Sequence, residues 1–326
     1  MVAHREAGLV CTCLGAGEEC HLTNVLHASV IASALGVRFM VVAFSPLSSD
    51  AHTCLAGAGA VVYSAPSQPS PGAELCNTIL TASQLLSSTP DAFIAWMEPD
   101  QEDFVRFAAH LAAQLEEGNV DVIAPVRPSN ISTYPAEQAH AEALGNLYLN
   151  KLLASHSATI AAYSKRPSKP LQIDWFFGPV VMRAAVAHFW HGEKITHQQK
   201  ELRTVTSLLA LLHAIRAGAK LSTPEISYVH LGARSPRMQV IDIAGRDGEF
   251  SSQMVKDSSP TTGSAESVLK QWLRLSTTIQ LVSEEILEMA RATVAQVSAS
   301  ITNGVSSLHS VPQNEMYQLH TLLPNV

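Results

Sequence analysis

The 326-residue chain is poor in charged residues, which make up 15% of it. Its 21 lysines and arginines are outnumbered by 28 aspartates and glutamates, which gives a formal net charge of -7, and no basic block stands out along the chain. A protein that neutralises nucleic-acid phosphates carries a basic stripe or patch. The composition therefore argues against nucleic acid as a partner.

Long hydrophobic runs are also missing. No uninterrupted apolar stretch approaches the ~20 residues that a membrane span requires, although 47% of the residues are hydrophobic. The first residues lack the basic-then-apolar layout of a secretory signal. The five cysteines are an odd number without the spacing of a disulfide framework. We therefore expect a soluble, cytoplasmic protein with no membrane span.

Short β-branched runs alternate with longer helical patterns over the first 130 residues, which predicts strands covered by helices. The expected strands lie at residues 8–13, 37–44, 60–64, 92–97 and 120–125. The expected helices between them lie at residues 22–35, 51–58, 73–86 and 104–117. Two further helices, 135–156 and 202–217, and a last strand, 221–230, are expected beyond them. The pattern predicts an α/β fold.

A polar, turn-rich stretch precedes the C-terminal part of the chain. From Leu269 to Met289 apolar residues recur every three or four positions, which predicts a long amphipathic helix. We expect residues 1–231 to form one domain, 232–264 a linker and 265–326 a helical extension. The apolar stripe must be buried against another surface, which either the chain's own sheet domain or another subunit can supply. We expect a homo-oligomer built partly on this helix.

The segment Glu98-Pro99-Asp100 follows directly after an expected buried strand. Ligands of open α/β sheets collect at the carboxyl ends of strands, and two carboxylates on one turn can hold a divalent cation that bridges phosphates. The same acids could instead fill the first turn of the next helix, where carboxylates suit the helix dipole. The local sequence leaves both interpretations open.

The serial order of these segments, over about the first 235 residues, resembles the nucleotide-sugar-dependent glycosyltransferases of the GT-A fold, especially their family-two-like members. The segments that carry the resemblance are the Ser-rich loop 45–50, the glycine-containing stretch 70–74, Glu98-Pro99-Asp100 in place of a DxD motif, the run 174–179, and His230. The resemblance implies a Rossmann-type mixed sheet flanked by helices, with a helical C-terminal extension.

The resemblance also implies an activity, which is the metal-dependent transfer of a hexose-like sugar. The donor would be a UDP- or GDP-linked sugar, the acceptor a small or medium molecule with a hydroxyl group, and the cofactor Mn²⁺ or Mg²⁺. Asp100, Glu98 and His230 would bind the metal. Asp174 would be the base that takes the proton of the acceptor hydroxyl. Asp174 could equally be a helix cap, and His230 a solvated strand-end residue.

The resemblance assigns further residues to the two substrates. The donor-binding residues would be Leu14, Glu18, Asp50, Gly72, Glu98 and Arg127. The acceptor-binding residues would be Tyr134, Glu137 and Trp175. Pro135, between the first two of these, is equally a plain signal for the start of a helix.

Two other functions compete with this one. A sugar nucleotidyltransferase of the same fold has a glycine-rich, basic loop after its first strand, whereas the loop here, residues 14–19, has glycines followed by two glutamates. A non-catalytic binding or assembly protein would explain two other departures from the family pattern. Ala43 and Phe44 replace the acids that hold the nucleotide base, and Glu98 replaces the first aspartate of the DxD motif.

Overall fold

The computed structural model describes residues 8–15, 18, 21–89, 92–128, 136–156, 172–193, 195–228 and 265–305. These residues contain one seven-stranded sheet with the order β3-β2-β1-β4-β6-β5-β7. Its strands are β1 (Gly8–Leu14), β2 (Arg38–Ala43), β3 (Ala60–Ser64), β4 (Phe93–Trp96), β5 (Val122–Ile123), β6 (Val180–Arg183) and β7 (Leu221–Ser222). The predicted α/β fold with a mixed sheet is confirmed.

The helices that surround the sheet agree closely with the sequence patterns. They are α1 (Leu22–Leu35), α2 (Ser49–Gly57), α3 (Pro71–Leu85), α4 (Val105–Glu117), α5 (Ala136–Ser155), α7 (Arg203–Arg216) and α8 (Ala265–Val305). Three short 3₁₀ helices, η3 (Glu102–Phe104), η4 (Ala184–His191) and η5 (Gln198–Glu201), complete the described elements. Local signals set several boundaries, since Ser48 caps the start of α2 and Gly36, in the left-handed region, ends α1.

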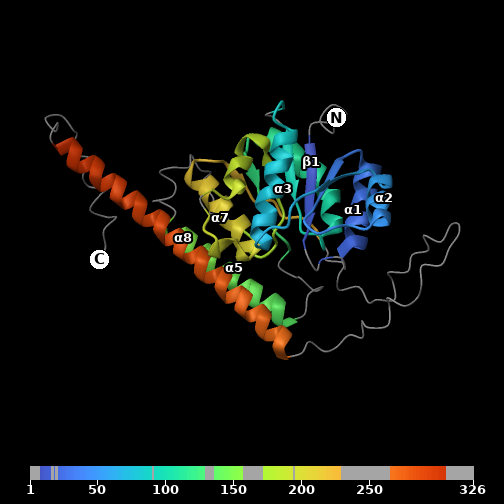
Figure 1. Ribbon diagram of the computed structural model, residues 1–326. Helices are drawn as coiled ribbons and strands as arrows, with labels where there is room; N and C mark the ends of the chain where they lie inside the picture. Colours follow the sequence, from blue (N-terminus) through green and yellow to red (C-terminus); the bar gives the residue numbers. More distant parts are fainter. Residues whose placement is uncertain are drawn as a thin grey trace.

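The sheet separates two hydrophobic cores, which gives the protein three layers (Figure 1). Along β1, Leu9 and Cys11 belong to one core, and Val10 and Leu14 belong to the other. This alternation follows from the two-residue period of a strand. The first core contains residues of α3, α5, α7 and α8, and the second contains residues of α1 and α4.

Strand β6 is the element that the sequence analysis missed. It is antiparallel to both of its neighbours, β4 and β5, whereas β1 pairs in parallel with β2 and β4. Residues 180–183 continue an apolar run from Trp175, so no alternation marks them as a strand. The expected strand 221–230 was too long, because regular pairing ends at Ser222, just before Pro224, which has no N–H to donate to a neighbour.

Helix α8 packs against α5 and α7, and its far end extends past the rest of the described molecule (Figure 1). Val282, Ile286 and Met289 of the predicted apolar stripe are buried in the core that α7 also contributes to. The chain therefore covers this part of the stripe itself. The homo-oligomer and the three-part division of the chain stay predictions. None of the described helices is both long enough and apolar enough to cross a bilayer.

The burial of Ile286 gives a test of this packing. Replacing Ile286, which is 0% exposed, with Ala should lower the free energy of unfolding by about 2–4 kcal/mol, because it removes buried methyl groups and leaves a cavity. Leu273→Ala on the same helix should change it by less than about 0.5 kcal/mol, because Leu273 is 56% exposed. Urea unfolding measures both values, and equal effects would contradict the docking of α8.

Candidate functional site

The strand order creates a topological switch point between β1 and β4. From β1 the chain proceeds outward to β2 and β3, and it then returns to form β4 on the other side of β1. A crevice forms at the carboxyl ends of two strands where the connections diverge in this way, and ligands of open α/β sheets bind there. The fold therefore predicts a binding site close to the ends of β1 and β4.

A cavity of about 450 Å³ lies at this point, and we call it the main cavity. Glu18, which follows β1, lines it together with Glu98 and Asp100, which follow β4. Phe176 and Arg203 contribute from the segment before β6 and from the start of α7. Three of the predicted site residues thus meet at one cavity, although they are up to 82 positions apart in the sequence.

Arg203 is the central cation of the site. Its Nη1 and Nη2 atoms donate to the two carboxylate oxygens of Glu18 at 2.6 and 2.8 Å, and Nη2 also donates to Glu74 at 2.5 Å. A longer contact of 3.5 Å joins Nη1 to Glu98. One guanidinium therefore faces three carboxylates from three different elements, and negative charge is in excess.

The excess of negative charge affects the pKa values of the three glutamates. Burial raises the pKa of Glu98 to about 7; Arg203 opposes the rise, and the charges of Asp100 and Glu18 add to it. Burial also raises the pKa of Glu74 despite its bond to Arg203. For Glu18 burial acts in the same direction, but the hydrogen bonds and charge of Arg203 prevail and lower the pKa. Glu98 is thus the carboxylate whose charge is least compensated by the protein.

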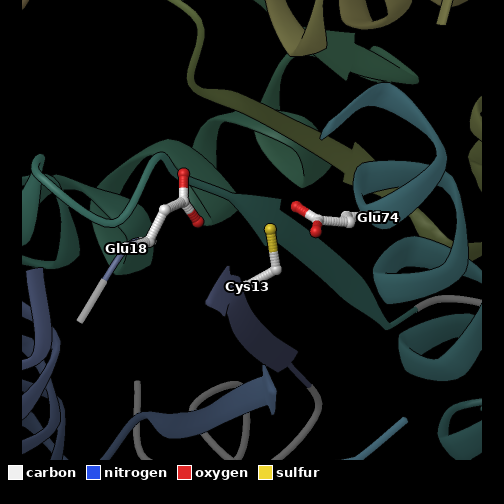
Figure 2. A group of neighbouring side chains, drawn as sticks. All are labelled: Cys13, Glu18 and Glu74. Carbon is white, nitrogen blue, oxygen red and sulfur yellow. The ribbon is translucent and has the colours of Figure 1, made fainter. Parts of the chain in front are cut away.

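Figure 2 shows that Cys13, Glu18 and Glu74 point toward one another. Their potential ligand atoms lie within 4.8 Å of one another, which is close enough for a metal ion. Arg203, however, already donates to both glutamates. Burial raises the pKa of the Cys13 thiol well above its usual value, so the thiol is protonated and a poor ligand. The cation that the two glutamates hold is the guanidinium of Arg203.

Gln101 fixes the acidic turn after β4. Its side-chain oxygen accepts a hydrogen bond from the backbone N–H of Glu98 at 3.1 Å, and its side-chain nitrogen donates to the carbonyl oxygen of Phe177 at 2.7 Å. A buried glutamine therefore ties the turn to the segment before β6. This arrangement holds Glu98 and Asp100 at the edge of the main cavity.

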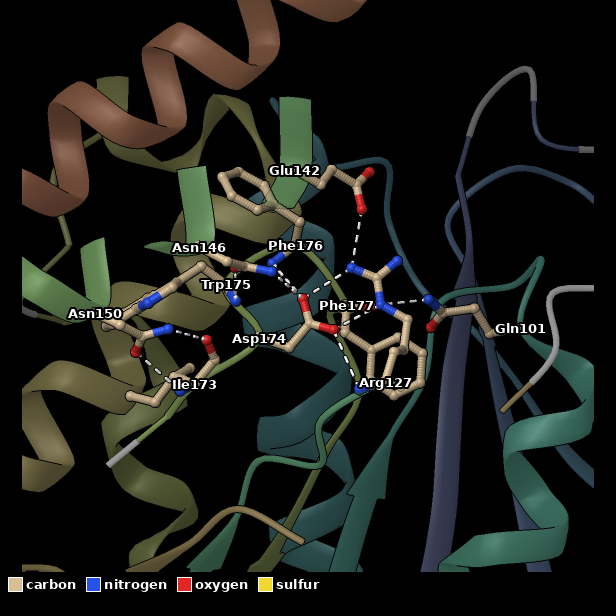
Figure 3. A network of polar contacts seen from close by, with 10 residues as sticks. All are labelled: Gln101, Arg127, Glu142, Asn146, Asn150, Ile173, Asp174, Trp175, Phe176 and Phe177. Carbon is tan, nitrogen blue, oxygen red and sulfur yellow. Dashed lines mark hydrogen bonds and ion pairs between the residues drawn. The ribbon is translucent and has the colours of Figure 1, made fainter. Parts of the chain in front are cut away.

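Asp174 and Arg127 form the centre of a second polar network (Figure 3). Arg127 Nε and Nη2 donate to the two carboxylate oxygens of Asp174 at 2.6 and 2.8 Å, and Nη2 also donates to Glu142 at 2.9 Å. Asn146 donates a further bond to Asp174 at 2.9 Å. Both charged side chains of the Arg127–Asp174 pair are almost fully buried. Of the four residues, only Glu142 lines the main cavity.

These contacts bear on the predicted role of Asp174 as the catalytic base. Burial alone would raise its pKa, but the hydrogen bonds and charge of Arg127, with help from Asn146, lower it. A base needs a free oxygen within reach of the substrate proton and a pKa near the working pH. The catalytic role of Asp174 stays a prediction, and its two bonds to Arg127 count against it.

Several other predicted site residues lie away from the main cavity. Leu14 is buried in the core, and Asp50 is exposed in the first turn of α2. A Cβ atom on Gly72 would overlap the backbone oxygen of Lys200, so this glycine allows α3 to approach η5 closely. Trp175 is fully buried in the core, and its indole N–H has no acceptor among the described residues. These four residues do not line the cavity.

The other predictions lie where the structure describes less. Tyr134 and His230 are outside the described residues, and Glu137 is described only through its backbone in α5. Their roles as acceptor-binding residues and as a metal ligand stay predictions.

Sequence reasoning missed Arg203 and Gln101. One signal for Arg203 was present, because it is the first residue of α7 and no acidic residue accompanies it in the first turn. A cation at a helix N-terminus is unfavourable for the helix dipole, which indicates that tertiary contacts hold it there. No comparable signal marks Gln101, since glutamine is common at the start of helices.

We compared the chain with protein families, curated sequences and solved structures, and only solved structures are similar to it. No protein-family model and no curated protein sequence matches the chain. Among solved structures, the chain is similar to glucosyl-3-phosphoglycerate synthase from Mycobacterium tuberculosis in complex with Mn²⁺, UDP-glucose and phosphoglyceric acid. The two sequences are 14% identical and the TM-score is 0.44. The match covers 88% of this chain and 80% of the synthase chain. A structure of the same synthase with Mn²⁺, UDP and phosphoglyceric acid has 15% identity, a TM-score of 0.40, and coverage of 69% and 70%.

A further structure, described as a mycobacterial protein, has 13% identity and a TM-score of 0.44, with coverage of 88% of this chain and 76% of that one. Similarity at this level does not establish a shared function. The function proposed below therefore depends on the site of this chain itself.

The raised pKa of Glu98 predicts how stability depends on pH in metal-free protein. An acid whose pKa rises from 4.5 to about 7 on folding binds its proton more tightly in the folded state, so it destabilises the fold progressively as the pH rises through that range. Glu98→Gln should therefore be more stable than the wild type at pH 8, by roughly 1–3 kcal/mol, and the difference should vanish near pH 4.5. Urea unfolding in a chelating buffer measures it.

The exposed Glu117 provides a control, and Glu117→Gln should change stability little at either pH. A Glu98→Gln variant less stable than the wild type at pH 8 would show that Arg203 compensates the charge of Glu98 fully.

Proposed function

We propose that the protein is a metal-dependent glycosyltransferase, which moves a sugar from a nucleotide-diphosphate donor to a hydroxyl acceptor. The observation that carries the proposal is the position of Glu98 and Asp100. Both line the main cavity, on the turn after β4, at the switch point of the sheet. Acids that merely filled the first turn of a helix would have no reason to face this crevice.

The donor set suits a hard divalent cation. Carboxylate oxygens are the ligands that Mg²⁺ and Mn²⁺ prefer, and Glu98 and Asp100 supply them in the main cavity beside Glu18. The only cation that contacts Glu98 among the described residues is Arg203, at 3.5 Å. A Mn²⁺ or Mg²⁺ ion held by Glu98 and Asp100 would supply positive charge that stabilises the diphosphate leaving group.

The chain's own residues contribute to donor binding in two ways. Arg203 lines the cavity and brings a positive charge to it, which favours a phosphate group. Phe176 also lines the cavity and offers an apolar ring surface for a sugar or an acceptor. We propose UDP- and GDP-linked sugars as the donors to test first.

The transfer breaks the bond between the sugar carbon and the diphosphate and forms a bond to the acceptor oxygen, and the acceptor proton must pass to a base. Asp174 is the base that the sequence predicts. Glu142 and Glu201 are alternatives, because both line the main cavity and Asp174 does not. A pH profile of each single amide variant would identify the base, because its removal abolishes the acidic limb, where the rate falls as the base becomes protonated.

Mn²⁺ binding tests the metal site. Asp100→Asn and Glu98→Gln should each weaken Mn²⁺ binding at least about tenfold, equivalent to about 1.4 kcal/mol, because each removes a charged ligand. Asp103→Asn, on the neighbouring turn, should have no effect, because Asp103 pairs with Arg106. Electron paramagnetic resonance of free Mn²⁺ measures the affinity, and equal affinity in all four proteins would refute the site.

The release of UDP or GDP from a panel of nucleotide sugars, with and without Mn²⁺, tests the activity. We expect turnover that depends on Mn²⁺ and is lost in Asp100→Asn.

A non-catalytic binding protein is the second candidate, and the observation that favours it is the bidentate bond between Arg127 and Asp174. If the protein is a non-catalytic binding protein, calorimetry should detect binding of a nucleotide sugar, and no acceptor should cause its turnover. The nucleotidyltransferase has less support, because the loop after β1 carries Glu18, which accepts from the backbone N–H of Gly15 at 2.7 Å, where that class of enzyme has basic residues.

A further inference from the structure

A second cavity, of about 290 Å³, is separate from the main one. Its polar and ionisable lining residues are Gln68, Cys76, Asn77, His191, His197 and Lys200. The segment η5 forms a wall of both cavities, since Lys200 lines the second cavity and Glu201 lines the main one. The proposed glycosyltransferase activity makes no use of this second group of residues.

The charge balance of the second cavity is opposite to that of the main one. No aspartate or glutamate lines it, and no carboxylate in the described part of the chain lies within ion-pair distance of the half-buried Lys200. Burial raises the pKa of the Cys76 thiol to about 11, so the thiol is neutral at pH 7 and does not offset the lysine. Lys200 is therefore a cation without a counter-charge in a cavity.

The end of the Lys200 side chain lies beside Gly192. Gly192 has a φ of +76°, and a Cβ atom there would lie 3.0 Å from Lys200 Nζ and 2.5 Å from Cys76 Sγ. The absence of a side chain at Gly192 thus leaves the room that the lysine ammonium occupies, next to the end of η4.

The neighbouring polar groups are mostly hydrogen-bond donors. The side-chain nitrogens of Asn77 and Gln68 each donate one bond to a backbone oxygen, at 3.1 and 3.0 Å, and each has a second N–H to offer. His191 Nε2 lies 3.1 Å from Ser83 Oγ, and the Ser83 hydroxyl also donates to the carbonyl oxygen of Leu80 at 2.8 Å.

Two acids lie near the histidines but outside the lining. Glu201 is 4.0 Å from His197, and the negative charge of Glu193 raises the pKa of His191. Burial, followed by the neighbouring His188, lowers the pKa of His191. Both acids lie outside the lining, so Lys200 meets no carboxylate among the residues that line the cavity.

We propose that the second cavity binds a small phosphate-bearing anion, with Lys200 as its counter-charge and the amide groups of Asn77 and Gln68 as additional donors. The cavity is at the lower end of the size range of small-molecule sites, which suits inorganic phosphate or a small phosphate monoester. Helix α3 contributes Ala73, Cys76 and Asn77 to the lining.

Calorimetric titration with inorganic phosphate, and separately with glycerol phosphate, tests the proposal in a metal-free, low-salt buffer at pH 7. We expect the wild type to bind at least one of them, and Lys200→Met to weaken binding at least about tenfold, because it removes the charge. Lys151→Met, on the exposed face of α5, serves as the matched control and should bind as the wild type does. Binding of both probes, or of only one, identifies which kind of phosphate the cavity accepts.

Failure of both probes to bind at 10 mM (a concentration about tenfold above a weak Kd of ~1 mM) would overturn the proposal. Equal affinity of Lys200→Met and the wild type would overturn it as well. Thermal unfolding checks that the variant is folded, and Lys200→Gln replaces it if it is not. Mn²⁺ binding and sugar transfer are measured separately, so failure here is distinguishable from failure of the proposed function.

Discussion

The arrangement of the main cavity depends on one buried arginine. Arg203 joins Glu18, after β1, to Glu74, in α3, and it also contacts Glu98, after β4. Breaking a buried ion pair by removing one partner is strongly destabilising, because a charge remains buried without compensation. The arginine therefore holds two strand ends and one helix at a fixed distance around the cavity. Its single positive charge leaves the acids in excess, and this excess makes the cavity attractive to a second cation.

The sheet supplies the other half of the arrangement. The reversal of strand order next to β1 opens the crevice, and β6 closes its far side by pairing antiparallel with β4. The segment that leads into β6 contributes Phe176 to the cavity and receives the hydrogen bond from Gln101 to Phe177. A parallel strand in this place would enter from the opposite end of the sheet, and its preceding loop would lie far from the acidic turn.

The features that could be predicted from the sequence are those that depend on local patterns. Helices α1, α3 and α5 and the acidic turn at Glu98 carry their signals within a few residues, so periodicity and strand-end position were sufficient. Strand β6 depends on partners at residues 93–96 and 122–123, and no pattern inside residues 180–183 reveals them. Arg203 has partners 185, 129 and 105 positions away. For the same reason Asp174 was predicted as a base without knowledge that Arg127 would bind it.

The separation of Arg203 from its three glutamates has a consequence for synthesis of the chain. Ribosomes deliver Glu18, Glu74 and Glu98 within the first hundred residues, long before they deliver β6 and Arg203. The nascent β1–β4 half-sheet thus carries a group of carboxylates that repel one another, beside an unpaired edge of β4. Long-range contacts of this kind form slowly, because the loop-closure entropy must be paid first. Arg203 can join the three glutamates only after residue 203 has been made, and its single positive charge then offsets part of their repulsion.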